Sequence, residues 1–110
     1  MEGSVFQIKE DISWEDLGKG IKRKIYGFNK DLMMVKVKFE AEAVGTPHQH
    51  RHSQVSYVES GVFETTIGNQ TKILKKGDGF YAPPHQMHGV ICKEPGVLID
   101  VFNPHREDFL

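Results

Sequence analysis

Two histidines separated by a single residue, His48 and His50, have a spacing suited to metal chemistry. Residues i and i+2 of a β-strand face the same side, so a strand here would point both imidazoles at one place. Histidine is abundant, because the 110 residues include six and five of them lie between His48 and His88. A lone His-x-His pair is also typical of a solvated strand end, so the pair alone leaves both interpretations open.

A second segment, residues 77–88, makes the pair part of a larger pattern. The chain resembles the cupin superfamily, whose two motifs run G-x5-H-x-H-x3–4-E-x6-G and G-x5-P-x4-H-x3-N. The matching residues are, in chain order, His48, His50, Gly61, Gly77, Pro83 and His88. Gln54 stands where most cupins carry glutamate, Gly45 lies three residues too close to the first histidine, and Cys92 takes the place of the final asparagine.

The resemblance implies one metal ion held by His48, His50, Gln54 and His88. Three imidazoles and an amide oxygen suit a divalent transition metal better than calcium or magnesium. All four groups are neutral, so the ion would keep its full charge, attract an anionic ligand and act as a Lewis acid. The identity of the metal is undecided among zinc, nickel, iron, manganese and cobalt, since affinity alone does not determine which metal a site binds in a cell.

One acidic residue, Asp100, lies inside the apolar run of residues 97–102. Burying a carboxylate is costly unless it is paired or functional. Alternation places Asp100 and Phe102 on one strand face, and we expect this face to look into the fold. Arg106 follows in a short tail, so a structural Asp100–Arg106 ion pair and a functional pair are both open. In the functional case Asp100 transfers protons and Arg106 clamps a substrate carboxylate.

The whole chain resembles one group of small cupins, the pectin-degradation family. The stretches that carry this resemblance are residues 14–18, 22–24, 31–35, 98–102 and 106–110. That family linearises 4,5-unsaturated uronates from pectin or alginate to 5-keto-4-deoxyuronate. The resemblance implies catalytic roles for Asp100 and Arg106, and substrate contacts from Phe102 and Arg106. Gln49 and Tyr57 are further candidates for hydrogen bonds to the substrate.

The remaining histidines and the single cysteine have simpler interpretations. We expect His52 in the turn between the ligand strands, His85 in solvent after two prolines, and His105 at the surface or at the rim of the pocket. Cys92 lies in an apolar strand, and we expect it to be a small core residue.

The elements that would position these residues are strands. Apolar residues recur with period two, for example at Val35, Val37 and Phe39, and turn residues separate eight to ten such runs. Gly68-Asn69 predicts a two-residue hairpin, and residues 76–79 and 94–96 predict two more turns. The one helical turn is expected near Ser13. We therefore predict an all-β, RmlC-like cupin jelly-roll barrel in a single domain over residues 1–110.

The composition of the chain limits the classes of partner and the location that we expect for it. With 14 basic and 15 acidic residues the net charge is −1, which argues against nucleic-acid binding through a basic field. No apolar run reaches the length of a membrane span, no secretory segment is visible and one cysteine excludes an internal disulfide, so we expect a cytoplasmic protein. The expected partners are a small anionic sugar acid and a second copy of the chain, which would form a homodimer through strands within residues 1–30, such as residues 5–8.

Other functions remain open at this stage. A cupin dioxygenase would need an iron or copper ion and would take up oxygen. A non-catalytic sugar- or metabolite-binding cupin would bind without turnover and would not need Asp100. A sugar-phosphate epimerase is a further alternative, although such cupins often lack the metal quartet.

Overall fold

The computed structural model of the chain describes residues 3–110. Its strands are β1 (Glu15–Gly18), β2 (Ile21–Asn29), β3 (Leu32–Phe39), β4 (Val44–His48), β5 (Ser53–Ile67), β6 (Gln70–Lys75), β7 (Gly79–Ala82) and β8 (His88–Asn103). Two short 3-10 turns are η1 (Lys9–Asp11) and η2 (Glu107–Phe109). The all-β prediction is confirmed. Within residues 3–110 no helix is long and apolar enough to cross a membrane.

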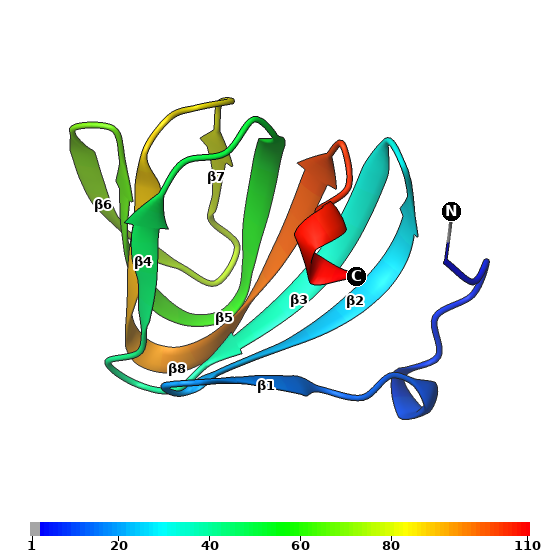
Figure 1. Cartoon of the computed structure of the whole chain (residues 1–110). Helices are drawn as coiled ribbons and strands as arrows, with labels where there is room; N and C mark the ends of the chain where they lie inside the picture. The colour runs from blue at the N-terminus through cyan, green and yellow to red at the C-terminus, as the bar shows by residue number, and fades with distance from the viewer. Residues whose placement is uncertain (1–2) are drawn as a thin grey trace.

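The strands form the predicted jelly roll around the long, bent strands β5 and β8 (Figure 1). The main path of antiparallel pairing runs β1-β2-β3-β8-β5-β6, with β4 added to β8 and β7 added to β5. The second half of β8 pairs with β3, while its first residues pair with β4. Two facing layers therefore share β5 and β8. The path ends at β1 and β6, so the barrel is open rather than a closed ring.

The predicted hairpin at Gly68-Asn69 is confirmed, because Ile67 pairs directly with Gln70 and Gly68 has a φ of 60°. The turn predicted at residues 94–96 is wrong. β8 runs through this segment because β5 bulges opposite it, between Val58 and Phe63, and both strands bend together. Gly61, with a φ of 84°, permits the close approach, since a Cβ atom there would lie 2.6 Å from the Cα of Gly96.

Two expectations for the N-terminal region are also wrong. The helical turn forms at η1 rather than near Ser13, because the residues after Trp14 pair with β2 as strand β1, and that pairing overrides the weak local capping pattern. Arg23 on β2 fixes this pairing with an ion pair to Glu15, at 2.8 Å between Nε and Oε1. Residues 5–8 form no strand in the described chain, and Val5 and Phe6 are strongly exposed.

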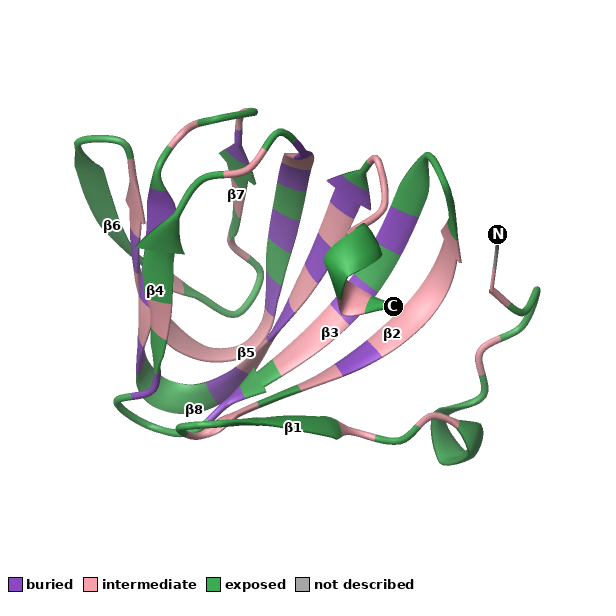
Figure 2. Cartoon of the chain, in the orientation of Figure 1, coloured by how far each residue is buried: buried purple, intermediate pink, exposed green. Residues whose placement is uncertain are grey.

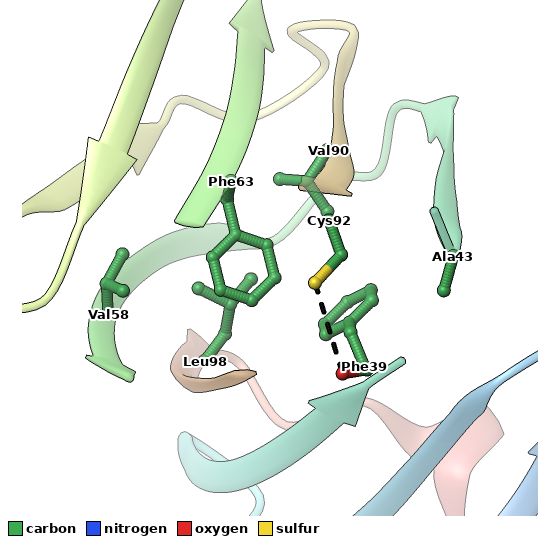
Figure 3. Packing of buried hydrophobic residues seen from close by; sticks show 7 residues of the cluster. All are labelled: Phe39, Ala43, Val58, Phe63, Val90, Cys92 and Leu98. Carbon is green, nitrogen blue, oxygen red and sulfur yellow. Dashed lines mark hydrogen bonds between the residues drawn. The ribbon is translucent and has the colours of Figure 1, made fainter. Parts of the chain in front are cut away.

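Alternation along β5 and β8 separates an apolar core from the outer surface (Figure 2). The larger buried cluster comprises Phe39, Ala43, Val58, Phe63, Val90, Cys92 and Leu98. Phe39 and Phe63 meet edge to face, with their ring centroids 5.2 Å apart. Figure 3 shows Cys92 between them, which confirms it as a core residue. A second cluster of Met33, Val35 and Phe102 lies beneath the C-terminal tail.

The centre of the core gives a stability prediction. Phe63 is fully buried, so Phe63→Ala removes a ring from a close-packed site, and we expect the free energy of unfolding to fall by about 3–5 kcal/mol. Ile73→Ala is the control, because Ile73 is exposed on β6 and its loss is expected to change the value by less than about 0.5 kcal/mol. Urea unfolding followed by circular dichroism measures both. Equal losses in the two variants would contradict this description of the core.

Candidate metal centre

Three histidines converge at the rim of the barrel, at the end of β4 and the start of β8. His48 and His88 are direct cross-strand partners, while His50 lies in the connection that follows β4. One nitrogen from each of the three rings lies within 4.8 Å of the others. The convergence therefore arises from the β4–β8 register and the bend after His48, and not from one continuous strand as the spacing predicted.

Backbone carbonyls fix which nitrogen of each ring faces the centre. Nδ1 of His48 donates to the carbonyl of Thr46 at 2.9 Å, and Nδ1 of His88 donates to that of Gln86 at the same distance. Nδ1 of His50 donates to the carbonyl of His52 at 3.1 Å. With Nδ1 carrying the proton, each Nε2 presents a lone pair, which is the arrangement found in histidines that bind metals.

The inward nitrogens have the chemistry of metal ligands. Nε2 of His88 is buried without a hydrogen-bond partner in the described chain, and a buried polar atom without a partner is costly. Burial lowers the pKa of His50 and of His88, which keeps both rings neutral and able to donate a lone pair. The residues present thus fit a divalent transition metal, for which neutral imidazole is a preferred ligand.

Gln54 lies beside the histidines on β5. Its Oε1 is 3.1 Å from Nε2 of His50, and its Nε2 donates to the hydroxyl of Ser56 at 3.0 Å. When the His50 ring is neutral with its proton on Nδ1, the first of these contacts joins two acceptors. Two acceptors this close repel one another unless a cation lies between them.

Asp100 is buried in the same cavity. A space of about 90 Å³ is lined by the polar residues His48, Gln54, His88 and Asp100 and by apolar residues that include Phe39 and Leu98. The hydroxyl of Ser56 donates to Oδ1 of Asp100 at 2.5 Å. Burial raises the pKa of Asp100 to about 6, although the Ser56 hydrogen bond and the charge of Arg106 oppose the rise. The side chains of Asp100 and Phe102 both point inward, as alternation along this strand predicted.

Arg106 is held above Phe102 by the C-terminal tail. Asp108 binds the guanidinium twice, through Nε at 3.0 Å and Nη2 at 2.9 Å. The guanidinium also stacks on Phe109, 4.4 Å from the ring centroid, and lies 5.3 Å from that of Phe102. Among the ion pairs of residues 3–110, Arg106 is paired with Asp108 and not with Asp100. The structural Asp100–Arg106 ion pair is therefore not formed, and Nη1 stays outside the Asp108 fork.

Two of the candidates for substrate binding are not among the residues that line the cavity. Tyr57 is half exposed on the outer face of β5, opposite to the inward Gln54 and Ser56, because it is an odd number of residues from Gln54. Its contact with a substrate stays a prediction. Gln49 is exposed at the rim between two histidines, and its contact with a substrate stays a prediction.

The other histidines support the rim. His52 lies in the turn, as expected, and is buried with its Nε2 3.0 Å from the carbonyl of His105. His105 in turn bonds the carbonyl of Lys30 through Nδ1 at 3.0 Å, which attaches the tail to the β2–β3 turn. His85 is exposed, as predicted. Sequence reasoning missed Ser56 and Asp108. The alternation of Gln54 and Ser56 was the available signal for the first, and no pattern pointed to the second.

The chain is similar to known proteins along most of its length. The model of the cupin domain family matches residues 35–102, more than half of the chain. The pectin degradation protein KdgF of Dickeya dadantii (strain 3937) is 51% identical over 105 residues, which cover 94% of this chain and 96% of that protein.

Two solved structures cover almost the whole chain. The RmlC-like cupin from Shewanella frigidimarina NCIMB 400 superposes with a TM-score of 0.97 at 47% identity, covering 99% of this chain and 98% of that chain. The structure of KdgF from Halomonas sp. gives a TM-score of 0.93 at 45% identity, with coverage of 98% and 100%.

The raised pKa of Asp100 predicts a stability that falls as the pH rises. Between 3.8, the ordinary pKa, and about 6 the unfolded chain releases this proton before the folded chain does, so ionisation favours unfolding. Above pH 6 the ionised carboxyl of Asp100 lowers the free energy of unfolding by about 3 kcal/mol, at 1.36 kcal/mol per pKa unit. Asp100→Asn removes it, so the stability of this variant relative to wild type should increase by about that amount between pH 4 and pH 7.5.

Urea unfolding in the presence of a chelator measures this difference at the two pH values. The wild-type curve provides the control, because the other titrating groups are the same in both proteins. A difference that does not change with pH would show that the burial of Asp100 does not raise its pKa.

Proposed function

This chain belongs to the cupin domain family, and from that premise we propose that it opens the ring of 4,5-unsaturated uronates to give linear 5-keto-4-deoxyuronates. The near full-length identity to a pectin degradation protein supports the substrate class. The observation that carries the proposal is structural: three imidazoles converge, and two of them, those of His48 and His88, line one cavity with a buried carboxyl, Asp100.

The proposed metal ligands are His48, His50, Gln54 and His88. The three imidazoles would donate through Nε2 and the amide through Oε1, since these atoms face one another and the remaining ring nitrogens are occupied by backbone carbonyls. A divalent transition metal bound there supplies a positive charge that stabilises an oxyanion developing on the substrate.

The reaction needs a proton to be moved and no oxidant. The C1 hydroxyl of the cyclic hemiacetal loses its proton, and the bond between C1 and the ring oxygen breaks. C1 becomes an aldehyde, and the ring oxygen keeps the electron pair of the broken bond and becomes the enolate oxygen on C5. A proton added to C4 then gives the ketone. We propose that Asp100 accepts the first proton and delivers the second, because a carboxyl with a pKa of about 6 exchanges protons readily near neutral pH.

Arg106 and Phe102 form the proposed contacts to the rest of the substrate. Asp108 binds Nε and Nη2 of Arg106, so Nη1 can bind a second carboxylate, that of the substrate. Pairing of a guanidinium with a carboxylate would both attract the substrate by charge and fix its orientation. Phe102 is buried beneath the guanidinium and offers an apolar wall. Gln49 at the rim is the proposed polar contact.

Assembly and location follow as further proposals. We propose a homodimer in which the N-terminal segment packs against a second copy, supported by the exposure of Val5, Phe6 and Ile8. A cytoplasmic location stays a prediction, supported by the single buried thiol of Cys92.

The activity prediction uses the monomeric unsaturated uronate, whose ultraviolet absorbance disappears as the double bond is lost. Asp100→Asn should lower kcat by about 100-fold or more, the contribution typical of general acid–base catalysis. His88→Ala should lose both metal and activity. Glu64→Gln on β5, distant in sequence from the proposed ligands and half-buried, is the control and should retain the wild-type rate. Equal rates in all four proteins, above the spontaneous reaction, would contradict the assignment.

A companion prediction concerns the clamp. Arg106→Ala should raise KM by about 10-fold or more, because a charge-assisted pair contributes about 1.5–3 kcal/mol to binding. Asp108→Asn keeps the guanidinium but weakens its fork, so a smaller increase in KM is expected with kcat unchanged. Steady-state kinetics measures both. Oxygen uptake during turnover would instead favour the dioxygenase, and saturable binding without turnover would favour a binding protein.

A further inference from the structure

We infer that Ser56 is a positioning residue that holds the amide of Gln54 with its oxygen toward the three histidines. This inference rests on the metal site of the proposed function. Ser56 is 2% exposed and Gln54 is 6% exposed, so water does not compete for the bonds between them. The sequence places both side chains inward, because they are two residues apart on β5.

The directions of the two hydrogen bonds made by the Ser56 side chain follow from its bond to Asp100. The hydroxyl of Ser56 has a single proton, which it donates to Oδ1 of Asp100. The oxygen of Ser56 then has only lone pairs to offer, and the Gln54 atom 3.0 Å away must be the amide nitrogen. The amide oxygen is thereby turned toward His50.

The sheet register brings these groups together. Ser56 on β5 and Asp100 on β8 are direct cross-strand partners. Two residues further along the same two strands, Gln54 is the partner of Phe102. The serine therefore stands between the acid and the fourth proposed ligand, bonded to both.

Loss of the Ser56 hydroxyl would free the amide to rotate. In the reversed orientation an N–H of Gln54 would donate to the lone pair of His50 Nε2, the atom 3.1 Å from Oε1 in the present arrangement. That hydrogen bond would satisfy the histidine without a metal and would present a donor to an incoming cation. The hydroxyl thus favours the metal-binding arrangement over a self-satisfied one.

The test is a double-mutant cycle on metal affinity. Cobalt(II) chloride is titrated into the chelator-treated full-length chain, and binding is followed by calorimetry and by the visible spectrum of the ion. Ser56→Ala should weaken binding by about 10- to 100-fold, the usual effect of losing a group that orients a ligand. In a Gln54→Glu background the same substitution should change affinity by less than about 3-fold, because a carboxyl group presents an oxygen to the histidines whichever way it is turned.

Two further proteins separate positioning from packing. Thr65→Val removes another buried β5 hydroxyl, one that bonds only weakly to the carbonyl of Phe63, and should keep the wild-type affinity. Ser56→Thr keeps the hydroxyl and should recover most of the affinity lost in Ser56→Ala. Thermal unfolding of the metal-free variants verifies that each is folded at the titration temperature.

The outcomes distinguish this inference from the proposal on which it rests. Undiminished cobalt affinity in Ser56→Ala, or an equal loss in the wild-type and Gln54→Glu backgrounds, would overturn the positioning role while leaving the metal site intact. Wild-type protein that binds no cobalt, zinc or nickel would overturn both. A loss confined to the glutamine background, with recovery in Ser56→Thr, is the result that supports the inference.

Discussion

The rest of this structure depends on one constraint, the inward orientation of three neutral imidazoles. Each ring donates from Nδ1 to a nearby backbone carbonyl, so the three Nε2 lone pairs point at one another. Lone pairs in such an arrangement repel, and nothing in the local chain would hold them together. The fold supplies the restraint through the β4–β8 register, which sets His48 directly across from His88, and through the bend that returns His50 toward them.

The two long strands β5 and β8 reconcile this polar rim with a stable core. Each strand carries apolar side chains inward over one part of its length and polar side chains inward over another. Phe63 and Cys92 lie in the apolar part, whereas Gln54 and Asp100 lie in the polar part. Buried polar groups are costly only when they lack partners. Gln54, Ser56 and Asp100 are partners of one another, so the inner polar groups are largely satisfied before any ligand binds.

The sequence could predict the features that depend on short spacing. The histidines followed from their motif spacing, and the inward position of Asp100 followed from alternation within residues 97–102. Features that depend on distant strands were missed. The expected turn at residues 94–96 is bridged because β5 bulges opposite it, and the expected helical turn near Ser13 gives way to pairing with β2. The Asp108 fork on Arg106 depends on how the tail folds back, which no local pattern records.

The distribution of charge explains why a glutamine suits position 54 when Asp100 is already present. The Ser56 hydroxyl is bonded to both Asp100 and Gln54, so a carboxylate at position 54 would put two negative charges in one cavity of about 90 Å³. Like charges at that range raise the pKa of one partner strongly, and the pair would share a proton. A neutral amide avoids this and leaves Asp100 as the one carboxyl lining the cavity in the described chain, under the opposing influence of burial and Arg106. The neutral ligand set and the proposed proton-transfer group are therefore two consequences of one electrostatic requirement.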